Sequence, residues 1–212
     1  MRHKLLYLLA FALTATSSGW GQDANALVYS SGGKLCKMIL PKTPSDPTLE
    51  TFPSCFANGN PVRVYLDQTS GRMIVETIEP NDGTPDTLQF EPDKFAVFGG
   101  SLGKAVASAS ITLESGSIRS IFGGGMFVGN AGTGKTTQAV VDKYSYKNTD
   151  GSGYTPVNAD VSDAVSIEIK PGAVVSHLLL GGGRYYAKTN TVNIKADKAT
   201  IMAIYAGGYD QG

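Results

Sequence analysis

The chain has 212 residues, and its 18 Lys or Arg side chains balance its 18 Asp or Glu side chains, so its formal net charge at pH 7 is zero. A neutral chain lacks the basic surface by which proteins attract nucleic acid or anionic membranes, and we therefore predict neither as a partner. Glycine is frequent, with 26 residues, and charged residues make up only 17%, a composition typical of proteins rich in strands and turns.

Residues 1–26 have the features of a secretory signal peptide. The basic stretch Met1–Lys4 precedes an uncharged, mainly apolar run from Leu5 to Ala15, which is about half the length needed to span a bilayer. Cleavage is expected after the small-residue pattern Ala24–Ala26, or alternatively after Gly21. No second apolar stretch is long enough to span a membrane. We predict a secreted or cell-surface protein without a membrane span.

Residues 27–84 are predicted to form a small β region. Short strands are expected at Leu27–Tyr29 and Leu35–Leu40. A hairpin is expected from Val62–Leu66 and Met73–Ile78, because the five residues Asp67–Gly71 between them end in glycine.

The two cysteines, Cys36 and Cys55, are nineteen positions apart in this first region. In an exported chain the expected arrangement is one disulfide between them. A loop of that length would stabilise the fold by about 3 kcal/mol. A metal site is not predicted, because the cysteines lack the spacing of metal ligands and no histidine lies near them.

A sequence unit repeats through residues 85–212, and each copy ends in an apolar strand followed by glycines. The four copies of that strand are Ala96–Gly100, Ile118–Gly125, Leu178–Gly183 and Ile201–Gly208. An alternating triplet precedes each copy: Leu88–Phe90, Ile111–Leu113, Ile167–Ile169 and Val192–Ile194. The first corner positions are Gly99, Gly123, Gly181 and Ala206, at intervals of 24, 58 and 25 residues. The long interval fits the same period if about 33 residues, approximately 129–163, are an insertion.

A period in the mid-twenties is the length of one coil of a parallel β-helix, in which each strand pairs with the equivalent strand of the next coil. Glycine permits the sharp corners between the faces of such a coil. We therefore predict an all-β protein with a short parallel β-helix, or solenoid, of about four coils. A β-sandwich is the alternative, because it too has short strands at regular intervals.

The segments ITLESGSIRSIFGGG, VSIEIKPGAVVSHLLLGGG and TVNIKADKATIMAIYAGGYDQG resemble the glycine-corner repeats of bacterial adhesin-like surface proteins. The resemblance covers residues 87–212 and implies a place of work at the cell surface. It supplies no catalytic residues. The chain departs from the repeat at Asp197-Lys198, where those proteins have two glycines, and in its long insertion.

The segment Gly129–Thr136 matches the phosphate-binding loop pattern G-x-x-x-x-G-K-[ST]. In a true loop of this kind, Gly129 and Gly134 would shape the backbone around the phosphates, Lys135 would contact them and Thr136 would hold Mg²⁺. Against this reading, the chain is expected to be exported, and only a three-residue apolar run precedes the loop. We interpret the match as fortuitous and keep a nucleotide-binding protein as the third alternative.

Other functional chemistry is sparse in the sequence. Outside the signal peptide His177 is the only histidine, so zinc sites with two or three histidines are excluded, and no cofactor or metal is predicted. Acidic residues of the insertion region could serve a carbohydrate-active enzyme: Asp142, Asp150, Asp160 and Asp163. An aromatic platform for sugar rings could include Tyr144, Tyr146, Tyr154, Arg184, Tyr185 and Tyr186.

The sequence thus predicts a secreted or cell-surface, non-catalytic structural or adhesion protein. A carbohydrate-active or carbohydrate-binding β-helix protein is the alternative. The expected partners are a second copy of the chain or an extracellular glycan or protein, since an uncapped solenoid end exposes strand edges.

Overall fold

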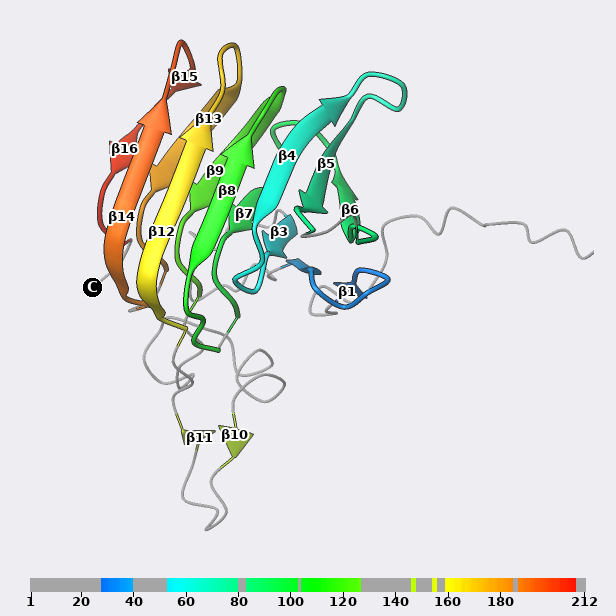
Figure 1. The fold of residues 1–212 in the computed structure, drawn as a ribbon. Helices are drawn as coiled ribbons and strands as arrows, with labels where there is room; N and C mark the ends of the chain where they lie inside the picture. The colour runs from blue at the N-terminus through cyan, green and yellow to red at the C-terminus, as the bar shows by residue number, and fades with distance from the viewer. Residues whose placement is uncertain are drawn as a thin grey trace, which may run out of the picture.

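The computed structural model describes residues 28–39, 53–79, 83–102, 104–126, 146–147, 154–155, 159–184 and 187–208. The described residues form β-strands and no helix, which confirms the predicted all-β class. Two mixed sheets lie face to face, and we call them sheet I and sheet II (Figure 1). The described residues include no helix with the length and apolarity that crossing a membrane requires.

Sheet I has eight strands in the order β1-β2-β3-β7-β9-β13-β15, and β16 pairs with β13 beside β15. Their bounds are β1 Val28–Tyr29, β2 Cys36–Ile39, β3 Pro53–Phe56, β7 Ala96–Phe98, β9 Ser117–Phe122, β13 Val174–Leu180, β15 Thr200–Ile201 and β16 Ile204–Tyr205. The pairs β1–β2 and β2–β3 are antiparallel, and every later pair is parallel.

Sheet II has six strands in the order β14-β12-β8-β4-β5-β6. Their bounds are β4 Val62–Asp67, β5 Arg72–Thr77, β6 Thr87–Phe90, β8 Ala109–Leu113, β12 Val161–Ile169 and β14 Thr189–Ala196. The strands β4, β8, β12 and β14 are parallel, and β5 and β6 continue the sheet by antiparallel pairing. A separate ribbon consists of β10 Tyr146–Lys147 and β11 Tyr154–Thr155.

Strands from residues 27–84 and from residues 85–212 share both sheets. β3 pairs with β7 in sheet I, and β4 pairs with β8 in sheet II. The predicted hairpin is confirmed as β4 and β5, and Gly71 at the end of its loop has a φ of 65°, a conformation that glycine adopts without strain. β12 begins at Val161, so the last three residues of the predicted insertion belong to a strand.

In sheet I the parallel pairs join equivalent positions of the sequence repeat, and in sheet II they do so for one of the two pairs of triplets. In sheet II, Ile111 pairs with Ile167, and Ile167 pairs with Ile194. The triplet at 192–194 is therefore two residues out of the register that the sequence predicts, and its side chains keep the predicted face because the strand period is two.

The triplet Leu88–Phe90 does not take the predicted place in the parallel stack. It lies in β6, antiparallel to β5, while Val62 pairs with Ile111 in its stead. Alternation alone gives the face of a strand and not its partner, which explains the error.

The glycine corners stack through backbone hydrogen bonds at the predicted equivalent positions. The N–H of Gly99 donates to the carbonyl of Phe122 at 2.9 Å, and that of Gly123 donates to Leu180 at 2.8 Å. The N–H of Gly181 donates to Tyr205 at 2.9 Å. Each corner is thus fixed to the corner of the following repeat unit.

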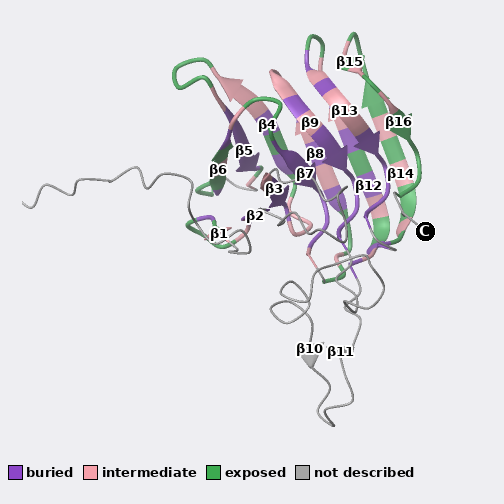
Figure 2. Ribbon diagram, turned by 180° about the vertical axis from the view of Figure 1, so that it is seen from behind, coloured by how far each residue is buried: buried purple, intermediate pink, exposed green. Residues whose placement is uncertain are grey.

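The main hydrophobic core lies between the two sheets, with Val97, Ile121 and Leu179 from sheet I and Ile111 and Ile167 from sheet II (Figure 2). A second buried cluster contains the next residue along each of three sheet I strands, which points to the opposite face. In it Phe98 stacks between Phe56 and Phe122, with ring centroids 4.7 and 4.3 Å apart.

The predicted disulfide between Cys36 and Cys55 is wrong, because both cysteines are free and buried. Cys36 pairs with Phe56, and Cys55 pairs with Lys37 on the same two strands. Neighbouring positions of a strand point to opposite faces, and Cys36 accordingly belongs to the second cluster while Cys55 belongs to the main core. The strand pairing that brings the two residues close in the backbone therefore separates their sulfur atoms.

Candidate functional site

The solvent face of sheet II carries the polar side chains of the parallel stack. Along β12, Val165, Ile167 and Ile169 are buried, whereas Ser166 is exposed and Glu168 is half-buried. Ser166 pairs with Asn193 of β14, and Glu168 pairs with Lys195. The parallel register thus places these four polar residues together on one face.

Glu168 is held by two lysines on this face. Lys170 Nζ and Lys195 Nζ each lie 2.9 Å from Glu168 Oε1. The hydrogen bond from Lys170, followed by that from Lys195, keeps the pKa of Glu168 below its ordinary value. The hydrogen bond to Glu168 in turn raises the pKa of Lys195. Glu168 is therefore a carboxylate that accepts hydrogen bonds, and it is unsuited to act as a general acid, which needs a raised pKa.

A shallow groove of about 530 Å³ is lined by β12 and β14. Its lining consists of Ser166, Ile167, Glu168, Val192, Asn193, Ile194 and Lys195. Hydroxyl, amide, carboxylate and ammonium groups are the types that hydrogen-bond to neutral polar ligands such as sugars. The lining thus offers hydrogen-bonding groups to such a ligand, and it does not contain the pair of carboxylates that cleaves a glycosidic bond.

A second polar group lies on the β4–β5 hairpin. Arg63 Nη2 is 2.5 Å from Glu76 Oε1, and Tyr65 donates its hydroxyl to Glu76 Oε2 at 2.6 Å. Burial acts to raise the pKa of Glu76, but the hydrogen bonds from Tyr65 and Arg63 hold it below its ordinary value. The Glu76 hydrogen bond raises the pKa values of both Arg63 and Tyr65. Both carboxylate oxygens of Glu76 are therefore engaged by Arg63 and Tyr65, which indicates a structural role.

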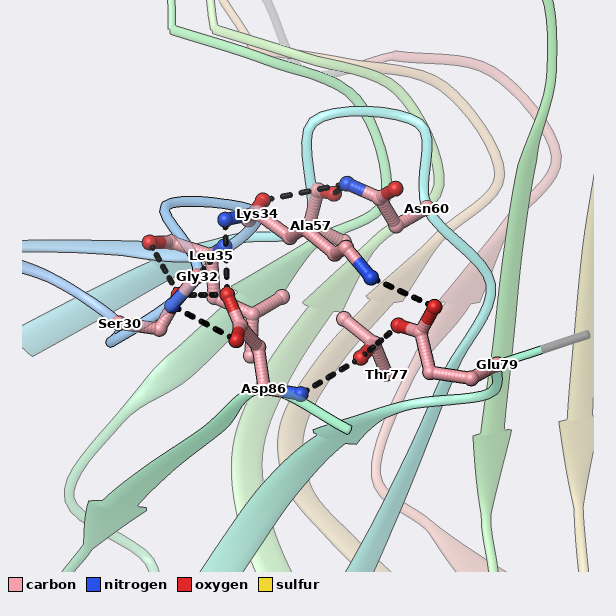
Figure 3. A network of polar contacts seen from close by, with 9 residues as sticks. All are labelled: Ser30, Gly32, Lys34, Leu35, Ala57, Asn60, Thr77, Glu79 and Asp86. Atoms are coloured by element: carbon pink, nitrogen blue, oxygen red, sulfur yellow. Dashed lines mark hydrogen bonds and ion pairs between the residues drawn. The ribbon is translucent and has the colours of Figure 1, made fainter. Parts of the chain in front are cut away.

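A polar network fastens the β1–β2 turn to the segment between β5 and β6 (Figure 3). Asp86 accepts hydrogen bonds from the Ser30 hydroxyl at 2.6 Å, the Gly32 N–H at 2.8 Å and the Lys34 N–H at 2.9 Å. Its own N–H donates to the Thr77 hydroxyl oxygen at 2.9 Å. These bonds, that from Ser30 first, lower the pKa of Asp86.

The same network continues to Glu79. The Lys34 ammonium lies 2.6 Å from Glu79 Oε2, and the Thr77 hydroxyl donates to Glu79 Oε1. The bonds drawn in Figure 3 thus connect the turn after β1, in sheet I, with the residues between β5 and β6, in sheet II.

The residues predicted as an aromatic platform are only partly described. Tyr144, Tyr185 and Tyr186 lie outside the described residues. Tyr146 pairs with Thr155, and Tyr154 pairs with Lys147, so the two tyrosines of the ribbon are not paired with each other. Arg184 is buried, and its N–H donates to the carbonyl of Gly125 at 2.9 Å.

The phosphate-loop pattern, Gly129 to Thr136, lies outside the described residues, as do Asp142 and Asp150. The nucleotide-binding reading therefore stays a prediction. Of the remaining acids, Asp160 accepts the Lys188 N–H at 2.7 Å, and the Asp163 side chain is exposed. No interaction between the carboxylates of Asp160 and Asp163, the two described acids of the insertion region, suggests the carboxylate pair of a glycosidase.

His177 lies in β13, where two residues, Ser176 and His177, stand opposite one residue of β9. Its buried Nδ1 has no hydrogen-bond partner among the described residues. The described residues also contain no group of three or more His, Cys, Asp or Glu side chains that could hold a metal ion.

Two features of these surfaces are absent from the sequence predictions. The Glu168–Lys195 pair follows from the register Ile167–Ile194, and a correct alignment of the triplets would have found it. The Asp86 network joins Ser30 to a residue 56 positions later, and no local pattern signals it.

Comparisons with protein-family models, with curated proteins and with solved structures gave no match to this chain.

Proposed function

We propose that this protein is a secreted or cell-surface, non-catalytic protein of structural or adhesive type, built around a short parallel β-solenoid. The observation that carries the proposal is the stacking of the glycine corners, at Gly99, Gly123 and Gly181, by hydrogen bonds from each repeat unit to the next. Repeats that contact only their neighbours produce a rigid, elongated scaffold whose outer faces are free for binding.

The chemistry of the described side chains supports a non-catalytic role. Three acidic groups of the described residues, Asp86, Glu76 and Glu168, have lowered pKa values and accept hydrogen bonds from the protein itself. Catalytic acids and bases need pKa values near the working pH and an open path to substrate. These acids instead fix strands and turns.

The proposal is tested in the cells that produce the protein. Antibody labelling of intact cells, or detection in the medium, is expected, and loss of the gene is expected to reduce attachment to coated surfaces. Detection only after lysis, with unchanged attachment, would contradict the proposal. Turnover of a polysaccharide by the pure protein would contradict its non-catalytic part.

A second candidate, carbohydrate binding without hydrolysis, is favoured by the polar groove on β12 and β14. The changes Ser166→Ala and Asn193→Ala should weaken binding on a glycan array at least tenfold, because each removes a hydrogen-bonding group from the groove. Thr112→Ala is the matched control, since Thr112 pairs with Glu168 on the same face and does not line the groove. An array with no binding, or equal loss in all three variants, would rule the candidate out.

A further inference from the structure

The two ends of the strand stack differ in how they finish. At the N-terminal end, sheet I closes with the antiparallel strands β1 and β2, and sheet II closes with β5 and β6. The Asp86 network fastens these two closures together. At the other end β14 and β15–β16 are the last strands, and no described strand pairs with their outer edges (Figure 1).

Rows of side chains at paired positions, which we call ladders, cross sheet I and end at β16. The core ladder passes from Val97 through Ile121 and Leu179 to Ile204. The first three are fully buried, whereas Ile204 is 53% exposed. A residue inside the stack is covered by the strands on both sides, and among the described strands Ile204 has a neighbour on one side only.

The ladder on the opposite face ends in the same way. It passes from Phe98 through Phe122 and Leu180 to Tyr205. The inner members are buried, and Tyr205 is 56% exposed. Met202, between β15 and β16, is 72% exposed.

Sheet II contributes Val192 and Ile194, which are only partly buried although they pack against the main core. Their register partners on β12, Val165 and Ile167, are buried. The last described strands thus present a cross-section through the hydrophobic core. Interfaces of obligate homodimers have this character of a core cut in half.

Over residues 189–194 the edge of β14 has no lysine or proline to protect it from pairing. Lysines, prolines, bulges or extreme shortness usually protect such edges. The segment Thr189–Ile194 contains no charge and no proline, and β14 is eight residues long. Of residues 189–208, only Lys195, Asp197 and Lys198 are charged. All three lie at the turn end of β14, and Lys195 is bound to Glu168.

We propose that this open end, formed by β14, β15 and β16, binds the same face of a second copy of the chain. A two-fold axis in the plane of the interface, running from sheet I to sheet II, would place β14 antiparallel to its copy. The same axis would place the β15–β16 edge against its own copy, so one operation covers both free edges.

The charge distribution fits this symmetry. Antiparallel pairing carries the turn at residues 195–198, whose charged residues are Lys195, Asp197 and Lys198, to the Thr189 end of the other copy's β14, which Lys188 precedes. The two charged turns therefore lie at opposite ends of the interface and do not face each other. Burial of Ile204, Tyr205 and Met202 would supply the hydrophobic driving force.

Head-to-tail stacking of copies fits less well. It would have to pair the open end with β1 in sheet I, which has only two residues, and with β6 in sheet II, which has four. β14, with eight residues, would leave much of its edge uncovered on such a partner. The inference concerns the surface alone and holds wherever the protein works, so it is tested separately from the proposed function.

Sedimentation velocity of the purified full chain, over a range of micromolar concentrations, tests the proposal. Wild-type protein should sediment as a dimer, and Ile204→Lys and Tyr205→Arg should weaken dimerisation at least a hundredfold. Tyr29→Arg is the matched control, because Tyr29 lies on β1 at the closed end and is 59% exposed. It should leave the dimer unchanged.

Three outcomes would overturn the interface. They are a wild-type monomer at every concentration, a dimer that persists in both open-end variants, and equal disruption by Tyr29→Arg, which would indicate head-to-tail stacking.

Hydrogen exchange of the wild-type protein tests the interface without variants, so its result does not depend on whether the variants fold. Dilution should increase the exchange rate of β14 amides and leave that of β6 amides unchanged, and uniform rates at all concentrations would contradict the proposal. A surface-displayed monomer would overturn the interface alone, and a dimer confined to the cytosol would overturn the proposed function alone.

Discussion

A Cβ atom added at Gly123 would lie 2.3 Å from the carbonyl oxygen of Gly181 and 2.3 Å from Cγ1 of Val165. The corner of one repeat unit therefore approaches the next more closely than any side chain would allow. Glycine is needed here for space, which explains why the first corner position is glycine at 99, 123 and 181.

Gly123→Ala should accordingly lower the free energy of unfolding by about 2–3 kcal/mol, since the added methyl group overpacks a backbone contact. Gly207→Ala is the matched control, because a Cβ atom at that corner glycine of the open end would meet nothing within 4 Å. Urea denaturation of both variants makes the comparison. Equal stability of the two would show that the corners are not packed as described.

The phenylalanine stack provides the second prediction. Phe98→Ala should destabilise the protein by about 3–5 kcal/mol, because it leaves a cavity between Phe56 and Phe122. Phe98→Leu fills most of that cavity and should cost clearly less. Thermal and urea unfolding should rank wild type, Leu and Ala in that order, and an Ala variant as stable as wild type would refute the stack.

The third prediction concerns Asp86 and its three hydrogen bonds. Asp86→Asn should cost about 2 kcal/mol at neutral pH, because charge-assisted hydrogen bonds to a buried carboxylate are lost. Asp163→Asn is the control, since the Asp163 side chain is exposed and its replacement should change stability by less than about 0.5 kcal/mol.

This effect depends on pH with a defined sign. The pKa of Asp86 is lowered from 3.8 in the folded protein, so its stabilisation is complete above the unfolded-state pKa. The stabilisation is lost as the pH falls through the lower, folded-state pKa. The stability difference between wild type and Asp86→Asn should therefore be constant from neutral pH to about pH 5 and shrink below about pH 4. A difference that grows in acid would contradict this reading.

The fourth prediction follows from the two free thiols. Burial raises the pKa of Cys36 to about 11 and raises that of Cys55 well above its ordinary value. At pH 8 only about one Cys36 in a thousand is then a thiolate, the reactive form. A thiol reagent should label neither cysteine in the native protein and both after denaturation, and reducing agents should leave the melting temperature unchanged. A mass two hydrogens lower without reductant would instead indicate the disulfide.

Local patterns sufficed to predict much of the fold. The apolar strands before the glycines and the turn at Gly71 are properties of a few neighbouring residues, and the structure has strands and corners at those places. The equivalence of Ile118 with Ile201, and of Phe122 with Tyr205, also follows from the repeat, and both members of each pair meet the same residue of β13.

Long-range register could not be read from the same patterns. The faces of Cys36 and Cys55 depend on which residue of β2 stands opposite which residue of β3. The position of Leu88 depends on whether its strand, β6, pairs with β5 or with β8, and in the structure it pairs with β5. The Asp86 network joins the turn after β1 to the segment between β5 and β6, which is far away in the sequence. Its members share no sequence motif.

The intact mass of the protein recovered outside the producing cells tests the central claim, that this is an exported protein, most directly. The predicted result is a chain that begins at Leu27 or, for the alternative cleavage site, at Gln22. Protein that is found only in the cytosol and begins at Met1 would contradict the account.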